Sequence, residues 1–198
     1  MKTKSIHTSR TAMLCISHVC TRKWLQIHDC CITESNSSQK SGLYRNLLVL
    51  ATTSFMESEL LRMGKGEYDL SEMFIVRQKY LNQLEDNYYR GGNGNLGQGS
   101  LSHTWKNAFN QVGIVPEEVY HGINYNSEKH NHGEMVRYIN ALGNTAVKMK
   151  RRSPEYYKLI NNLFDTYLGE LPEKFTYKGK EYTPKSFAES LGLNMDDY

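Results

Sequence analysis

Residues 47–63 read LLVLATTSFMESELLRM, and Gly64 and Gly66 follow directly. The first half of this segment is apolar on nearly all sides of a helical projection, a pattern typical of a helix buried at the centre of a fold. Glycine just after the last apolar residue commonly ends a helix. We therefore expect a buried central helix over 47–63, with the rest of the chain packed around it.

Downstream segments repeat the helical spacing of apolar residues and carry recognisable start signals. Asp69 or Ser71 can cap the second helix, and Ser100 can cap the third. A Gly-rich loop, GGNGNLGQGS over 91–100, separates those two helices. The expected helices span about 71–89, 101–112, 134–148, 154–168 and 184–191. Residues 175–183 (FTYKGKEYT) predict a short hairpin that turns at Lys178-Gly179. The expected fold class is α+β, mostly helical.

Composition excludes several classes of protein. Hydrophobic residues make up 39% of the 198 and charged residues 23%, as in globular proteins. A net charge of +3 without a basic stripe argues against a nucleic-acid partner. No apolar run reaches the ~18 residues of a membrane span, and the N-terminus lacks the apolar region of a signal peptide. We expect a soluble chain, cytoplasmic by default.

Three apparent motifs do not match the sites that they first suggest. All four cysteines lie within the first 31 residues, which argues against a disulfide framework, and their spacing fits no zinc site (Cys15, Cys20, Cys30 and Cys31). The triplet His130-Asn131-His132 suggests a nuclease, but no further ligand set accompanies it, so a polar loop is favoured. The loop at 91–100 lacks the ending of a phosphate-binding P-loop. We expect no metal and no organic cofactor.

Four collinear segments resemble papain-like cysteine peptidases of the bleomycin hydrolase group, which includes the bacterial aminopeptidases C. They are ESELLRMGKGEYDLSEM (57–73), NLGQGSLSHTW (95–105), GIVPEEVYHG (113–122) and LGELPEKFTYKGKEYTPKSFAESLGLNMDDY (168–198). The likeness is continuous from about Ala51 to Tyr198. It implies the helical left lobe of the papain architecture over 51–198, with a helical insertion near 134–198.

The resemblance also implies an activity and a partner. Members hydrolyse peptide bonds from the N-terminus through a Cys thiolate, and they form homo-oligomers. Their Gly-Gly loop binds the extended peptide backbone, and glycine permits its close approach. By position Gly97 and Gln98 match the Gly-Gly pair, with Gly99 beside them. These three residues are the expected substrate-binding residues, and Gln98 departs from the family pattern.

The catalytic positions of the family are altered or absent. The family motif places a Gln six residues before the Cys-Trp-Ser-Phe that opens the central helix. Here Ser41 stands at the position of the oxyanion-hole Gln and Leu47 at the position of the nucleophile. The family's His and Asn lie in a second, β-rich lobe, downstream of the segment matched here. We expect an inactive fragment of a peptidase, with a non-catalytic peptide-binding subunit as the alternative.

The coding frame offers an explanation for the altered motif. When the last two bases of each codon are read with the first base of the next, residues 38–50 permit Val-Lys-Asn-Gln-Gly-Ser-Thr-Gly-Thr-Cys-Trp-Ser, and Leu50 with one restored base permits the final Phe. That string is the family signature with its spacing intact. We therefore interpret residues 1–50, to which no element is assigned, as an N-terminus translated in a shifted frame.

Overall fold

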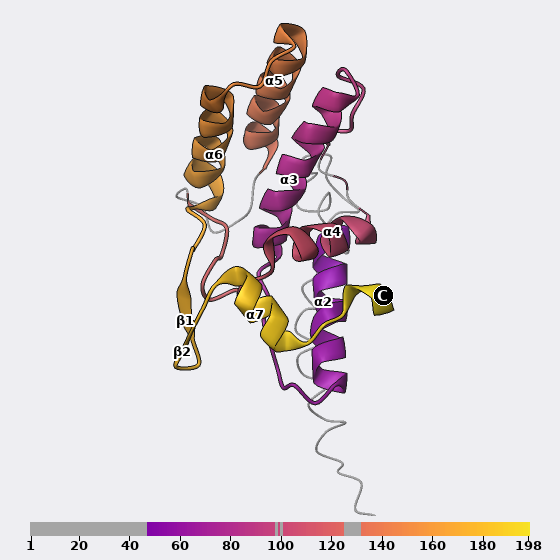
Figure 1. The fold of residues 1–198 in the computed structure, drawn as a ribbon, viewed down its shortest axis with the longest axis vertical. Coiled ribbons are helices and arrows are strands. Elements are labelled where there is room, and N and C mark those ends of the chain that lie inside the picture. The colour runs from indigo at the N-terminus through magenta and orange to yellow at the C-terminus, as the bar shows by residue number, and fades with distance from the viewer. Residues whose placement is uncertain (1–46, 98, 100, 125–131) are drawn as a thin grey trace, which may run out of the picture.

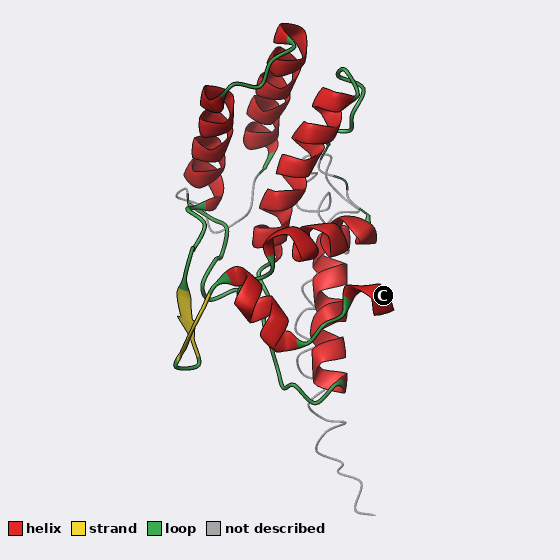
Figure 2. Ribbon diagram, viewed as in Figure 1, coloured by secondary structure: helices red, strands yellow, loops and turns green. Residues whose placement is uncertain are grey.

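The computed structural model describes residues 47–97, 99, 101–124 and 132–198. This part of the chain is α+β: mostly helical, with one small antiparallel sheet (Figure 2). The helices are α2 (Leu47–Arg62), α3 (Glu72–Tyr89), α4 (Ser102–Val112), α5 (Gly133–Met149), α6 (Pro154–Leu168) and α7 (Pro184–Leu191). Strands β1 (Phe175–Tyr177) and β2 (Lys180–Tyr182) form a hairpin, and the 3-10 turn η2 covers Met195–Asp197.

Helix α3 connects the two ends of the molecule. Figure 1 shows α5 and α6 standing beside α3 at one end, while α2 and α7 lie at the other end. Helix α4 crosses between them and packs against α2, α3 and α7. The hairpin continues from α6 and leads back to α7, so the chain returns to α2 at its C-terminal residues.

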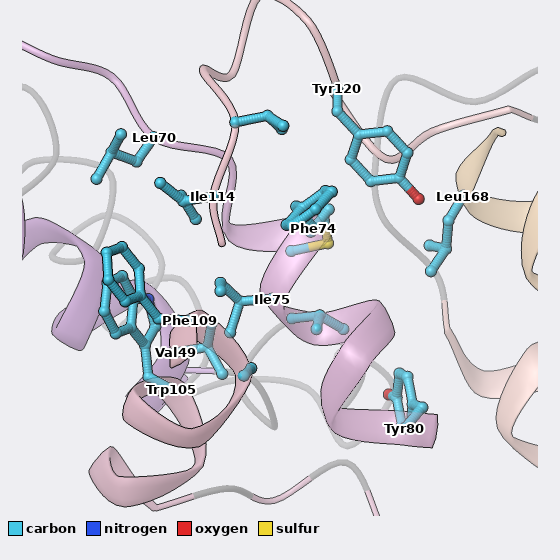
Figure 3. Packing of buried hydrophobic residues seen from close by; sticks show 14 of the residues in the cluster. Val49, Leu70, Phe74, Ile75, Tyr80, Trp105, Phe109, Ile114, Tyr120 and Leu168 are labelled. Carbon is cyan, nitrogen blue, oxygen red and sulfur yellow. The ribbon is translucent and has the colours of Figure 1, made fainter. Parts of the chain in front are cut away.

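The hydrophobic core lies where α2, α3 and α4 meet. Leu70, Ile75 and Ile114 are completely buried there, and Trp105 and Phe109 stack on each other near Val49 (Figure 3). A second part of the same cluster continues along α3, where Tyr80 stacks on Phe164 of α6 with ring centroids 6.2 Å apart. One continuous core therefore joins α2 at one end of the molecule to α6 at the other.

Three helices begin with a side-chain cap, and one of these caps is the expected Ser71. Ser71 Oγ accepts a hydrogen bond from Phe74 N at 3.2 Å, and Ser153 Oγ accepts one from Tyr156 N at 3.3 Å. Thr183 forms a reciprocal capping box with Ser186. Each cap satisfies backbone donors that the first helical turn leaves without a partner. The start of α4 differs: it begins after Leu101, which makes no side-chain cap, and Ser100 lies outside the described residues.

The expected hairpin is also confirmed. Phe175 pairs with Tyr182 and Tyr177 with Lys180. Lys178 and Gly179 both have positive φ, 49° and 77°, as the central residues of a type I′ turn must. Across the described residues, no helix is both long enough and apolar enough to cross a membrane.

The expectation that the first half of α2 is buried on nearly all sides is wrong. Val49, Met56 and Leu60 are buried, but Leu48 is 45% exposed and Phe55 50% exposed. Helices α3 and α4 pack against α2, whereas Phe55 meets the C-terminal Tyr198 edge-on and stays half exposed. The helix begins at Leu47, so it extends across the expected boundary between residues 50 and 51.

Two charged side chains are buried on α3. The guanidinium of Arg77, 4% exposed, pairs with Asp165 of α6 at 2.7 Å and donates to Gly169 O at 2.8 Å. Lys79 is fully buried, and its ammonium lies 4.4 Å from the centre of the Tyr80 ring. Burial disfavours the charged form and lowers the pKa of Lys79 to about 7.

Candidate functional site

A groove of about 590 Å³ lies between the first half of α2, the start of α4 and the C-terminal residues. We call it the α2–α4 groove. Its volume falls within the range of ligand pockets, about 300–1,000 Å³. The lining residues are Ala51, Thr52, Phe55, Met56, Ser102, His103, Lys106, Asp197 and Tyr198.

A buried hydrogen bond fixes the two helices that form this groove. Trp105 Nε1 donates to Thr53 Oγ1 at 2.9 Å, and Thr53 Oγ1 donates to Val49 O at 2.9 Å. Both Trp105 and Thr53 are completely buried. Thr53 Oγ1 satisfies the buried indole N–H, so the bond ties α4 to the first turns of α2.

The rim of the groove is polar and its α2 wall is apolar. Lys106 Nζ, at the groove, lies 3.5 Å from the exposed Asp196 Oδ1 beside it. The ring of Tyr198 meets Phe55 edge-on at 5.8 Å, and the Tyr198 hydroxyl donates to Glu59 Oε2 at 3.2 Å. Partial burial and the bond to Glu59 raise the pKa of Tyr198, while hydrogen bonds from Arg62 hold the pKa of Glu59 below its usual range.

This arrangement can hold an extended or apolar ligand, but it has no thiol. All four cysteines precede residue 47 and lie outside the described residues. His103 is the titratable imidazole of the groove. No group of three or more His, Cys, Asp or Glu side chains in the described ranges is arranged to hold a metal ion.

The expected catalytic positions lie at or before the start of α2. Leu47 is the first residue of that helix, and its side chain is not among those described. Ser41, the oxyanion-equivalent position, and Gln98, in the glycine loop, lie outside the described residues, as do His130 and Asn131. Leu47 is thus the first residue of α2 that the structure describes.

The glycine loop is anchored to α3 and to itself. Gly97 N donates to Asn95 Oδ1 at 2.8 Å, and Gln83 Nε2 donates to Gly99 O at 3.3 Å. The loop leads directly into α4, whose first turn lines the α2–α4 groove. Gly97 itself lines a different pocket, and neither Gly97 nor Gly99 lines the groove.

That second pocket lies between the glycine loop, the end of α3 and the helix α5. It has a volume of about 340 Å³, and we call it the asparagine pocket. The lining residues are Asn87, Gly92, Gly94, Leu96, Gly97, Val136, Asn140 and Asn144. Sequence reasoning missed its asparagines, since isolated Asn residues on helices match no motif. Only the concentration of glycines in the adjoining loop pointed to this region.

Comparisons with known proteins add no relative. No protein-family model matches the chain, and no curated protein matches it. The family resemblance therefore rests on the four quoted segments, and the site rests on its own geometry.

Proposed function

We propose that this chain is the helical lobe of a papain-like cysteine aminopeptidase of the bleomycin hydrolase group, in a form without peptidase activity. One observation carries the proposal: a helix, α2, covers the residues that follow Leu47, where the resemblance places the nucleophile and the central helix.

The proposed loss of activity has a direct chemical cause. A thiol at a helix N-terminus is activated because the helix dipole stabilises the thiolate. Leucine has no ionisable group and cannot act as a nucleophile. Without a nucleophile at this position, an acyl-enzyme intermediate has no route to form.

The uncovered side of α2 supports the same proposal. In a two-lobed peptidase the substrate cleft lies between the lobes, so each lobe presents apolar surface to the other. Leu48 and Phe55 are about half exposed on α2, and Phe55 lines the α2–α4 groove. A second lobe packed beside this groove would cover both side chains.

The test is the acidity of a thiol placed at the proposed nucleophile position. Leu47→Cys puts it at the first residue of α2, and Met63→Cys, just past the C-terminal end, is the matched control. The four native cysteines are replaced by Ser in both variants. The helix-terminus effect is about 0.3–1 kcal/mol, or up to about 2, which is roughly 0.2–1.5 pKa units.

The pH dependence of alkylation by iodoacetamide measures both thiol pKa values. We expect the pKa at position 47 to lie below about 8.5 and that at position 63 at or above it. Equal values would remove the electrostatic basis of the proposal. Separately, the native chain should not hydrolyse aminoacyl fluorogenic substrates, nor react with a thiol-directed epoxide faster than free cysteine. Turnover of such substrates would contradict the proposed loss of activity.

A non-catalytic peptide-binding subunit is the second candidate. The continuous core from α2 to α6 and the three side-chain caps favour it, because they describe a lobe with its own packing. A folded, monodisperse chain that binds peptides would support this candidate. A chain that aggregates on expression would support the inactive fragment.

A further inference from the structure

Asn93 and Gly94 form the only Asn-Gly pair in the sequence of this chain. In such a pair the backbone nitrogen of the glycine can attack the side-chain amide of the asparagine, because glycine has no side chain to shield that nitrogen or restrict its approach. Asn93 is exposed, so water and hydroxide reach its amide. The glycine loop therefore contains a chemically reactive asparagine.

Packing against α3 requires glycine at position 94. A Cβ on Gly94 would lie 2.4 Å from Asn87 Cα and 2.7 Å from Asn87 N, closer than side chains approach in real structures. Gly94 N donates to Asn87 Oδ1 at 3.1 Å, and Asn87 is only 1% exposed. The loop folds back on α3 only with glycine at this position, so packing fixes the reactive neighbour of Asn93.

Asn93 has its own structural task at the end of α3. Arg90 is the C-cap residue of that helix, and its carbonyl oxygen accepts hydrogen bonds from Asn93 N at 3.3 Å and from Asn93 Nδ2 at 3.2 Å. Carbonyl groups at a helix C-terminus lack an intrahelical partner, and these bonds satisfy one of them. The Asn-Gly pair thus arises because two separate contacts at the end of α3 require its two residues.

We propose that Asn93 is a site of spontaneous deamidation, and that the isoaspartate it produces releases the glycine loop from α3. Hydroxide removes the proton of Gly94 N, and this nitrogen attacks Asn93 Cγ. The new N–Cγ bond closes a succinimide ring while the Cγ–Nδ2 bond breaks, and the nitrogen leaves as ammonia with a proton from water. Water then opens the ring at either carbonyl, which gives aspartate or isoaspartate.

The two products differ in what they do to the loop. In isoaspartate the backbone runs through Cβ and Cγ, so the chain gains a methylene before Gly94. Gly94 has no clearance against Asn87, and its N–H group cannot keep the bond to Asn87 Oδ1 after such a shift. Leu96 is 7% exposed and belongs to the core, so it is the next contact that a displaced loop loses. Aspartate leaves the backbone unchanged and should retain these contacts.

The folded structure slows the first step of this reaction. Gly94 N must leave Asn87 Oδ1 before it can attack, and Asn93 Nδ2 is held by Arg90 O. We expect Asn93 to react at least about twofold more slowly in the folded chain than in the unfolded chain, the effect of a weak hydrogen bond. This inference concerns the glycine loop and depends neither on the α2–α4 groove nor on the proposed peptidase ancestry.

The test follows the full chain during incubation in mildly alkaline buffer, both folded and unfolded in guanidinium chloride. Trypsin cleaves after Arg90 and Lys106, so one peptide contains Asn93 and an internal control, the exposed Asn95 that precedes Leu96. Tandem mass spectrometry locates the change from amide to acid. An Asp-specific protease cleaves at aspartate and not at isoaspartate, which separates the products. We expect Asn93 to react before every other asparagine of the chain.

Three variants test the contacts that control the reaction. Asn87→Ala removes the acceptor of Gly94 N and should accelerate deamidation of Asn93 by about two- to tenfold. Asn144→Ala, which removes an exposed amide beside the asparagine pocket, is the matched control and should leave the rate unchanged. Asn93→Gln moves the amide one carbon further from Gly94 N and should suppress the reaction.

Hydrogen exchange of the Gly94 amide measures the release of the loop. We expect this amide to exchange faster in the purified isoaspartate form than in the fresh chain, with the aspartate form unchanged. Slow exchange at Gly94 in the isoaspartate form would refute the release.

The other outcomes decide the site itself. Faster reaction at another asparagine, or no reaction at Asn93 in the folded chain, would overturn the assignment. Equal rates in the folded and unfolded chain would refute the control by the two hydrogen bonds. If Asn87→Ala does not fold, the comparison of the folded and unfolded native chain still decides between these outcomes.

Discussion

Thr52 and Thr53 of α2 provide a matched pair for testing how the α2–α4 groove is held together. Each hydroxyl donates to the carbonyl four residues earlier, Thr52 to Leu48 O at 2.7 Å and Thr53 to Val49 O at 2.9 Å. Only Thr53 also accepts from the buried indole of Trp105. Replacing either Thr by Val removes the hydroxyl and keeps the β-branched shape.

The structure predicts very different costs for the two substitutions. Thr53→Val leaves Trp105 Nε1 buried with no acceptor, which costs about 1–3 kcal/mol. For a chain of this length each kcal/mol shifts Tm by about 2–4 °C, so we expect a decrease of roughly 2–12 °C. Thr52→Val removes only a partly exposed i−4 bond and should change the free energy of unfolding by less than about 0.5 kcal/mol.

Urea and thermal unfolding, followed by far-UV circular dichroism, measure both variants against the parent chain. If only Thr53→Val lowers the free energy of unfolding, the result supports the packing of α4 on the first turns of α2. If both variants lower the free energy of unfolding equally, or neither lowers it, the hydrogen bond from Trp105 to Thr53 does not hold the two helices of the groove together.

Two further predictions concern the buried charges of α3. Asp165→Asn leaves the Arg77 guanidinium buried without its carboxylate and should lower the free energy of unfolding in urea by about 3 kcal/mol. Asp86→Asn, in the exposed pair with Arg90, is the control and should lower it by less than about 1 kcal/mol. If the two variants lose the same free energy of unfolding, the account of the buried pair is contradicted. Lys79 has a pKa of about 7 in the folded chain against a usual 10.5. Between pH 7 and 10.5 the unfolded chain therefore binds more protons than the folded chain. The free energy of unfolding should rise with pH over this range, by at most about 1.4 kcal/mol per pH unit. Lys79→Met should remove this rise; an unchanged pH profile would show that another group causes it.

Local chemistry made much of the fold predictable. Hydroxyl side chains that can cap free backbone N–H groups predict where three helices start. They belong to Ser71, to Ser153 before Pro154, and to Thr183 before Pro184. The pair Lys178-Gly179 likewise predicts the position of the hairpin turn. Each of these signals acts within a few residues along the chain, so the sequence carries it directly.

Long-range packing was not predictable from the same sequence. The apolar pattern of α2 predicts burial, but it does not show that α3 and α4 cover one side while Phe55 stays half exposed on the other. Asn87 Oδ1 accepts a hydrogen bond from Gly94 N only because the glycine loop folds back on α3, and no local pattern in the sequence shows that contact. Lys79 has the sequence signature of an exposed residue, and its burial results from tertiary packing alone.

The coding sequence across residues 38–50 tests most directly the proposal that this chain has lost a cysteine nucleophile at position 47. The frame-shift hypothesis predicts that the codons of Leu47 and Leu48 both end in G, because only then does the shifted frame read Cys-Trp at the start of α2. It also predicts a TCA codon for Ser41, which gives the oxyanion-hole Gln six residues earlier. A Leu47 codon with any other third base makes the shifted Cys impossible and would contradict the account.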